Sequence, residues 1–527
     1  MSKAADMAKI SAKGSFHMLW GLAASTVISA VGTIIISILL GEDNFGLYSI
    51  ALMAPNLIML FRDWGVSFAM IRYTAQNNAE NKTENIKGIF LSGLIFETVL
   101  GVALSLAGFF LSGFLATVIF NRPNIAPIIQ IASFIVLTNA LISTATAAFT
   151  GVEKMHLNSI MVVSQSIIKT VLVIVLVLFG LGTYGAITGV TLASLLAGII
   201  GVLLMFSIYR GFPSPENKRL NIRGNIRSML SYGVPLSVST ILAGFLLQYY
   251  NFLMANSVAD NALIGNFAIA QNFVVLITFF AQPVITMMFP AFSKLDAKRD
   301  HDTLMNVFRF SVKYASLLVV PATVLVMSMS IPAIGTIYQN RYSVAPLFLA
   351  LLAINYLYSA FGFLSAPSLI NSQGETRFTM KVGLLTAAVG LPLGYVLISQ
   401  FGVLGLIVTT LAYIVPSIVV NLLFIQLRFK ITVNWVSSAK ILVSSAIAGL
   451  ISYIVVSVLA GLPALGLLIL GVGVFLVVYV VAAVLTRTID GGDIDNLRNM
   501  VSALGPVGRV LGWVLRLIEK LIVFSGR

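Results

Sequence analysis

Four ionisable residues lie inside long apolar stretches of this 527-residue chain: Arg62, Asp63, Glu97 and Lys169. An unpaired charge at the middle of a bilayer costs roughly 2.5 to 3.5 kcal/mol on insertion scales, so these side chains are expected to face the protein interior. One interpretation is a neutral packing network, in which Arg62 pairs with Glu97. Asp63 would then pair with Lys169. The other interpretation is a site in which the bases bind an anionic substrate and the acids bind a coupling cation.

The spacing of the four charges predicts a single layer. Each lies about ten residues from the cytoplasmic end of its predicted helix, which corresponds to about 15 Å at 1.5 Å per residue. The reference positions are Arg72, Lys87 and Ser159. A depth of about 15 Å is half of a hydrocarbon core roughly 30 Å thick, so the layer is predicted near the membrane midplane.

The second half of the chain offers amides and aromatic rings instead of charges. The positions equivalent to Arg62 and Asp63 there are Ala281 and Gln282. A charged half and a polar half together predict an amphiphilic substrate, whose anionic group meets a base while sugar hydroxyls meet amides and ring faces. The candidate polar residues are Gln248, Tyr249, Asn251, Gln271 and Asn272.

The elements that position these residues are predicted to be transmembrane helices. With 58% apolar and only 9% charged residues, the chain cannot present a soluble surface. Apolar stretches of about 20 residues, long enough to cross a bilayer, predict an all-α polytopic membrane protein with about fourteen transmembrane helices. They start near residues 15, 46, 88, 125, 159, 184, 230, 264, 311, 344, 382, 404, 441 and 465.

An internal duplication organises the first twelve helices. The segment that begins Gly151-Val-Glu-Lys returns as Gly374-Glu-Thr-Arg, and Phe45-Gly46 matches Ile264-Gly265. Two six-helix repeats share one orientation, because an even number of crossings returns each to the same side, so a pseudo-twofold axis along the membrane normal is expected. The predicted parts are an N-lobe (1–210), a cytoplasmic linker (211–229), a C-lobe (230–428), helices 13 and 14 (429–486) and a cytoplasmic, interfacial amphipathic tail (487–527).

The net charge of +14 follows membrane topology and does not indicate nucleic-acid binding. Most of the 32 Lys and Arg residues fall on segments that are cytoplasmic if the N-terminus is inside. Both termini are therefore predicted in the cytoplasm of a multi-pass protein of the cell membrane. No nucleotide-binding loop, nucleophile elbow or metal-ligand spacing is present in the sequence, so neither a catalytic site nor a cofactor is predicted.

Several of these segments, taken in order, resemble one protein family. They are Leu40 to Ala51, Phe61-Arg-Asp-Trp-Gly65, Met288 to Ser293, and the two segments beginning at Gly151 and Gly374. In this order and spacing the chain is similar to the polysaccharide biosynthesis (Wzx-type) flippases of lipid-linked oligosaccharides. That family belongs to the multidrug/oligosaccharidyl-lipid/polysaccharide (MOP) exporter superfamily, which includes the MATE transporters.

The resemblance implies a flippase that moves an undecaprenyl- or dolichyl-linked oligosaccharide to the external leaflet by alternating access, without ATP. Arg62 and Lys169 would engage the pyrophosphate, and Asp63 and Glu97 would be sites for a coupling H⁺ or Na⁺. This chain departs from a strongly cationic cavity, because two acids balance two bases. The implied partners are membrane lipid and the glycosyltransferases and polymerase or ligase of the pathway. The protein itself would be a monomer, with helices 13 and 14 forming a groove for the lipid tail.

Two other functions compete with this interpretation. A MATE-like, ion-coupled antiporter of drugs or organic cations would share the twelve-helix fold, so the fold alone does not decide. A membrane glycosyltransferase or polymerase would need sizeable loops that carry acids and bases. The predicted loops of this chain are short, which disfavours the enzyme.

Overall fold

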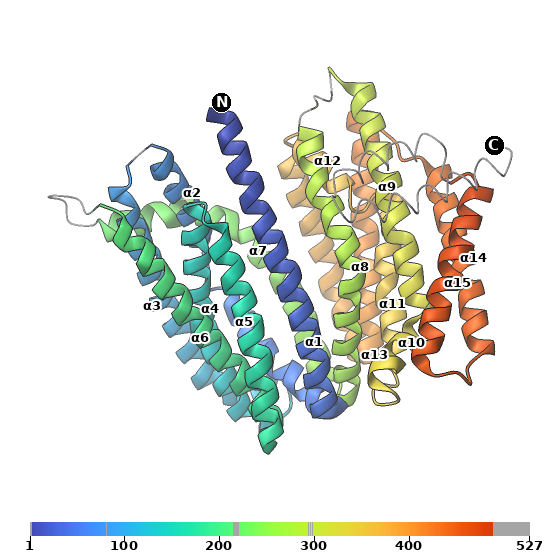
Figure 1. Ribbon diagram of the computed structural model, residues 1–527, viewed down its shortest axis with the longest axis horizontal. Coiled ribbons are helices and arrows are strands. Elements are labelled where there is room, and N and C mark those ends of the chain that lie inside the picture. Colours follow the sequence, from blue (N-terminus) through green and yellow to red (C-terminus); the bar gives the residue numbers. More distant parts are fainter. Residues whose placement is uncertain are drawn as a thin grey trace. The chain divides into compact units, whose positions relative to one another are not determined.

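The computed structural model describes residues 3–488 apart from 81, 214–220, 294, 296 and 298. Every regular element in this part of the chain is helical, as predicted, and fifteen α-helices follow one another along it (Figure 1). The chain forms two compact units, Met1–Ala268 with Ile398–Val403, and Ile269–Leu397 with Leu404–Arg527. Nearly all of the predicted amphipathic tail lies outside the described residues.

The helices of the first unit are α1 to α7 and the start of α8. Their bounds are α1 Lys3–Met59, α2 Val66–Ala79, α3 Glu84–Phe114, α4 Ala126–Gly151, α5 Met155–Leu176, α6 Gly182–Gly211, α7 Ile222–Ser257 and α8 Asn261–Ser293. Short helical segments at their ends are η1 Leu115–Ile119, η2 Pro123–Ile125 and η3 Val177–Leu181.

The second unit contains the rest of α8 and the helices that follow it. They are α9 His301–Ser328, α10 Ser330–Tyr338, α11 Ala345–Leu357, α12 Ala366–Ser372, α13 Thr376–Phe424, α14 Trp435–Val458 and α15 Ala464–Leu485, with η4 Tyr358–Phe361 and η5 Ile425–Phe429. The helices α14 and α15 pack against one another.

Within the described residues nine helical stretches are long and apolar enough to cross a membrane, or ten if the bent pair α11 and α12 counts as one. Three of them, of 40, 57 and 53 residues, are too long for one crossing, which takes about 20 residues. Each contains glycine in a non-helical conformation: Gly41 in α1, Gly180 and Gly182 around η3, and Gly402 in α13. These breaks fall where the sequence predicts a turn between two crossings.

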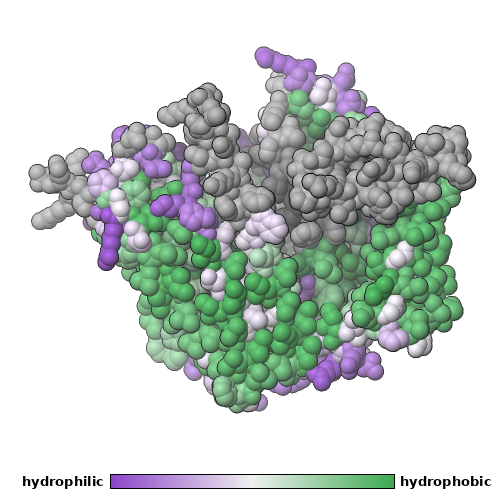
Figure 2. All heavy atoms as spheres, viewed as in Figure 1, coloured by the Kyte–Doolittle hydropathy of each residue, from purple (hydrophilic) through white to green (hydrophobic). Residues whose placement is uncertain are grey.

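Lipid-facing side chains mark the depth of the helices. Figure 2 shows apolar side chains over the flanks of the helices and hydrophilic ones near the helix ends. On α3 and η1 the exposed apolar side chains run from Ile95 to Val118. That band corresponds to about 35 Å at 1.5 Å per residue, close to the hydrocarbon thickness.

Small residues allow the helices of the first unit to approach closely. The hydroxyls of Ser25 on α1 and Ser166 on α5 are 2.9 Å apart. A Cβ on Gly32 would lie 2.3 Å from Thr170 Oγ1, so only glycine fits there. Close packing at glycine and interhelical hydroxyl hydrogen bonds are the usual means of joining helices in lipid. The lipid tails are as apolar as the side chains, so burying apolar surface between helices gives no hydrophobic driving force.

One contact joins the two sequence repeats through equivalent residues. A Cβ on Gly46 would lie 1.9 Å from the carbonyl oxygen of Asn261, and a Cβ on Gly265 would lie 2.2 Å from that of Glu42. Gly46 matches Gly265 in the duplication, and Glu42 matches Asn261. The contact is therefore reciprocal: each glycine packs against the backbone of the other repeat.

Candidate functional site

The predicted second helix is broken where its charges lie. The sequence predicts Arg62 and Asp63 within a helix, but α1 ends at Met59 and α2 begins at Val66, so the helical prediction is wrong at these two residues. Gly65 adopts φ 78°, a left-handed conformation that glycine adopts without strain. Non-helical backbone at membrane depth occurs where protein covers it or where it lines a cavity.

Helix α7 covers the break. A Cβ on Gly65 would lie 2.3 Å from the carbonyl oxygen of Gly233, and a Cβ on Gly233 would lie 2.5 Å from the carbonyl carbon of Gly65. Ser237 donates to the Gly233 carbonyl at 3.0 Å and lies 3.5 Å from the Asp63 carbonyl. The break is thus held by backbone contact, which two glycines permit.

Arg62 and Glu97 form a buried ion pair. Arg62 Nη1 donates to Glu97 Oε2, and the residues are only 8% and 1% exposed. Arg62 Nε and Glu97 Oε1 are buried and have no hydrogen-bond partner among the described residues. A buried polar atom without a partner costs about 1 to 3 kcal/mol, so the pair leaves one donor and one acceptor ready for a ligand or water.

Asp63 lies just before helix α2. Its Oδ1 accepts a hydrogen bond from the Ser67 backbone N–H at 3.2 Å, and a carboxylate is favourable at a helix N-terminus. Its carboxyl also lies close enough to that of Glu97 for the two to interact. Two carboxyls and one guanidinium therefore share the break, and we refer to Arg62, Asp63 and Glu97 as the charged cluster.

Lys169 makes no hydrogen bond or ion pair with the charged cluster in the described part of the chain. It is half-buried on α5 and forms no hydrogen bond or ion pair with any described residue. Glu97 is 13 residues from the start of α3 at Glu84, and Lys169 is 14 residues from the start of α5 at Met155. The single layer near the membrane midplane stays a prediction.

This geometry separates the two interpretations of the four charges. The predicted pair of Arg62 with Glu97 is present. The predicted pair of Asp63 with Lys169 is absent among the described residues, since Asp63 Oδ1 accepts from the Ser67 N–H and Lys169 makes no hydrogen bond or ion pair there. The charges do not form a closed neutral network.

The amide and aromatic candidates fall in both units. In the first unit Gln248 is buried on α7 and lies 3.5 Å from the Asn251 amide, while Tyr249 packs beside Tyr250. In the second unit Gln271 and Asn272 are adjacent and exposed on α8. Three polar residues of the break were not predicted: Ser67, Ser143, whose hydroxyl is 2.9 Å from that of Ser67, and Ser237.

No group of three or more His, Asp or Glu residues within the described range could hold a metal ion, and the sequence has no cysteine. The charged cluster has one guanidinium and two carboxyls. Its chemistry is that of binding an anion, through the arginine, or a single cation, through the acids.

A family model described as "Polysaccharide biosynthesis protein" matches residues 11–296, which is more than half of the chain. A curated relative, the "Probable low-salt glycan biosynthesis flippase Agl15" of Haloferax volcanii, is 21% identical over 315 residues, or 58% of this chain and 64% of that protein.

Two solved structures share the fold. "Lipid II flippase MurJ, inward closed conformation" superposes with a TM-score of 0.69 at 14% identity, over 88% of this chain and 98% of that one. A multidrug resistance MATE family transporter of the MOP superfamily, in its inward-facing conformation, superposes with a TM-score of 0.58 at 14% identity, over 78% and 98%. The fold is thus that of the MurJ and MATE proteins.

Proposed function

We propose, on the premise that this chain belongs to the polysaccharide biosynthesis protein family, that it is a flippase. Its substrate is a polyprenyl-linked oligosaccharide, which it moves from the cytoplasmic to the external leaflet by alternating access. The observation that carries the proposal is the charged cluster at the helix break, in which the ion pair of Arg62 with Glu97 is buried. Broken helices with exposed backbone ends are where secondary transporters bind their substrates and coupling ions.

Arg62 and Lys169 are the proposed contacts of the anionic head group. Arg62 retains an unpartnered Nε, and Lys169 has all three ammonium hydrogens available. Because no hydrogen bond or ion pair joins Lys169 to the charged cluster among the described residues, the two bases offer a phosphate two separate contacts.

Asp63 and Glu97 are the proposed site of a coupling cation, H⁺ or Na⁺. The cluster carries two acids and one base, and Glu97 Oε1 has no partner. Binding a cation there would neutralise the excess negative charge and free Arg62 to bind phosphate. One elementary charge moved through 100 mV is worth roughly 2.3 kcal/mol, which is enough to drive net movement without ATP.

The size of the fold match supports a long, lipid-linked substrate. The lipid II flippase superposes on 88% of this chain and the MATE transporter on 78%. The difference is about the combined length of α14 and α15. We propose that these two helices complete fourteen crossings and hold the lipid tail. The substrate would come from the glycosyltransferases of the pathway and pass to its polymerase or ligase.

Reconstituted protein tests the proposal. Proteoliposomes carrying a polyprenyl-diphosphate-linked oligosaccharide, labelled on the sugar, are expected to expose it to an external lectin without ATP. The rate should rise under an imposed H⁺ or Na⁺ gradient, and Glu97→Gln should remove that response. Dependence of the purified chain on ATP would contradict the proposal. Equal rates with and without either gradient would leave Asp63 and Glu97 without a coupling role.

An ion-coupled antiporter of organic cations is the second candidate. The excess of acid over base in the charged cluster favours it, since a cationic drug would be attracted to Asp63 and Glu97. The same proteoliposomes distinguish the two functions. Gradient-driven uptake of an organic cation, without movement of the labelled oligosaccharide, would establish the antiporter.

A further inference from the structure

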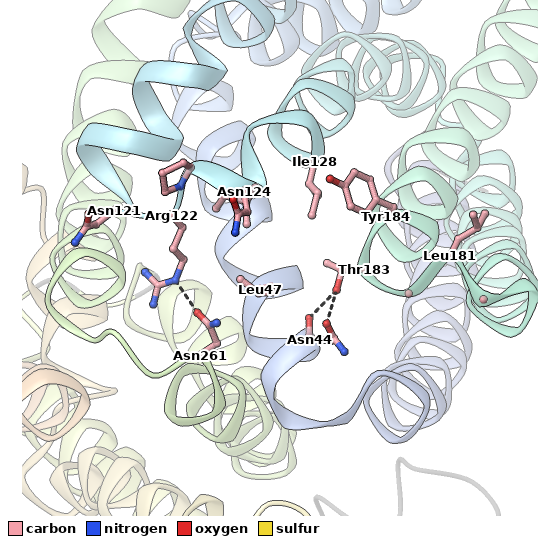
Figure 3. A pocket seen from close by; sticks show the side chains of 14 residues that line it. Asn44, Leu47, Asn121, Arg122, Asn124, Ile128, Leu181, Thr183, Tyr184 and Asn261 are labelled. Carbon is pink, nitrogen blue, oxygen red and sulfur yellow. Dashed lines mark hydrogen bonds between the residues drawn. The ribbon is translucent and has the colours of Figure 1, made fainter.

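A cavity of about 590 Å³, lined by both apolar and polar side chains, lies in the first unit (Figure 3). It forms where three helix junctions meet: the segment after the Gly41 break of α1, the residues between η1 and α4, and the residues between η3 and α6. The distribution of basic residues predicts that this end is external. The volume falls within the roughly 300 to 1,000 Å³ of small-molecule sites.

Amides and one aromatic ring lie among apolar side chains in the lining of this cavity. Figure 3 shows Asn44, Asn124, Thr183 and Tyr184 around the opening. Asn121 and Asn124 are exposed and form no hydrogen bond with other described residues, so their amides can both donate and accept. The Tyr184 side chain, 44% exposed, presents a ring with a hydroxyl at its tip. Such a set matches a sugar, which has hydroxyls at its edge and C–H groups on its faces.

Arg122, the basic residue in the lining of this cavity, is fully hydrogen-bonded to other parts of the protein. Arg122 Nε donates to Asn261 Oδ1 at 2.6 Å. Its four terminal N–H groups face carbonyl oxygens of Phe120, Ala255, Val258 and Ala259. Burial lowers the pKa of the Arg122 guanidinium, while the carboxylate of Asp43 raises it. Because all five donors are occupied, the cavity offers no free cation to a phosphate.

We propose that this cavity is a second binding site, which takes an uncharged or N-acetylated sugar of the oligosaccharide at the external face. The inference rests on the proposed flippase function. The glycan needs a polar site once its head group has crossed, and a site of neutral amides would release it more readily than a cationic one. Arg122 shapes the cavity by fastening the end of α7 and the start of α8 to the end of η1.

Single cysteines test this site, since the chain contains none. In the full-length reconstituted protein, Leu181→Cys places a thiol at the cavity. An impermeant maleimide added outside is expected to react with it, and N-acetylglucosamine or glucose at about ten times its Kd should slow the reaction about tenfold. Asn340→Cys, which is exposed outside this cavity, should not be protected. On the Leu181→Cys background, Tyr184→Phe should retain protection, whereas Tyr184→Ala and Asn124→Ala should lose it.

The outcomes separate this inference from the flippase proposal. If the labelled oligosaccharide moves normally but neither sugar slows the maleimide reaction of Leu181→Cys, the sugar site is overturned and the flippase proposal stands. Protection without any oligosaccharide movement would support the site and contradict the flippase. Stronger protection by pyrophosphate than by either sugar would show an anion site and overturn the inference, as would labelling from the cytoplasmic side alone.

Discussion

At the scale of single residues, the ion pair of Arg62 with Glu97 both joins the helix break to α3 and leaves polar atoms for a ligand. The two charges share one hydrogen bond, and each keeps a buried atom without a partner. If the pair only fixed helix packing, every polar atom of its guanidinium and carboxylate should be hydrogen-bonded, because buried polar groups almost always find partners. The unsatisfied atoms are therefore the feature that favours a ligand.

Removing the base should destabilise the protein more than removing the acid. Arg62→Gln leaves the carboxyls of Asp63 and Glu97 together without a cation, so we expect a loss of about 3 to 5 kcal/mol, the usual cost of breaking a buried ion pair. Glu97→Gln leaves Arg62 beside Asp63 and should cost less. Melting of the detergent-solubilised protein measures both. The control is Arg72→Gln, an exposed arginine over the Tyr232 ring, for which about 0.5 to 1 kcal/mol is expected.

Exchanging the two charges separates pairing from recognition. The double variant Arg62→Glu with Glu97→Arg keeps an ion pair, so abundance in the membrane should return toward that of the wild type. Oligosaccharide flipping should stay lost, because the cation has moved from the break to α3. Recovery of both abundance and flipping would show that the pair is structural only.

At the scale of helices, the break before α2 depends on two glycines in contact. Gly65→Ala would add a Cβ at φ 78° and 2.3 Å from the Gly233 carbonyl oxygen. The strain of a non-glycine residue in such a conformation is of order 1 to 3 kcal/mol, and the contact with α7 adds to it. We expect a lower melting temperature and slower flipping. Gly113→Ala, on α3 with nothing within 4 Å of its Cβ, should be neutral or slightly stabilising.

The contrast between these glycines shows what the sequence could predict. Apolar length and repeated motifs placed the helices, and turns fell at Gly41, Gly180 and Gly402 as predicted. The break at Gly65 was missed because Arg62 and Asp63 stand within an apolar stretch of full length. The order Asp-Trp-Gly, with an acid four residues before Ser67, was the available signal of a new helix N-terminus.

The cavity near Arg122 could not have been predicted from sequence. Its lining comes from helix junctions spread over the 140 residues from Asn44 to Tyr184, and Asn121 and Asn124 look like ordinary turn residues. Only the fold brings them to the same cavity as Tyr184. The charged cluster, in contrast, was half predictable, because charges inside apolar stretches are conspicuous even where their partners are not.

At the scale of the whole molecule, the predicted topology can be tested with the same cysteine-free chain. Cysteines at Lys82 and Arg428 should react only with a reagent on the cytoplasmic side, and those at Asp260 and Asn340 only with one outside. The reason is the basic-residue bias of the loops. Impermeant maleimide on intact cells and on inverted vesicles gives the measurement. External labelling at Lys82 would contradict fourteen crossings with both termini in the cytoplasm.

The reciprocal contact of Gly46 with Gly265 bears on the origin of the chain. Two copies that meet through the same residue make the contact of a twofold homodimer. Before duplication, a single six-helix ancestor paired in this way would have needed glycine at that position in both copies. Any larger residue would have created the same steric clash twice in the dimer. After fusion each glycine could change separately. That both copies still carry it indicates that the helices still need to pass this closely at their crossing point.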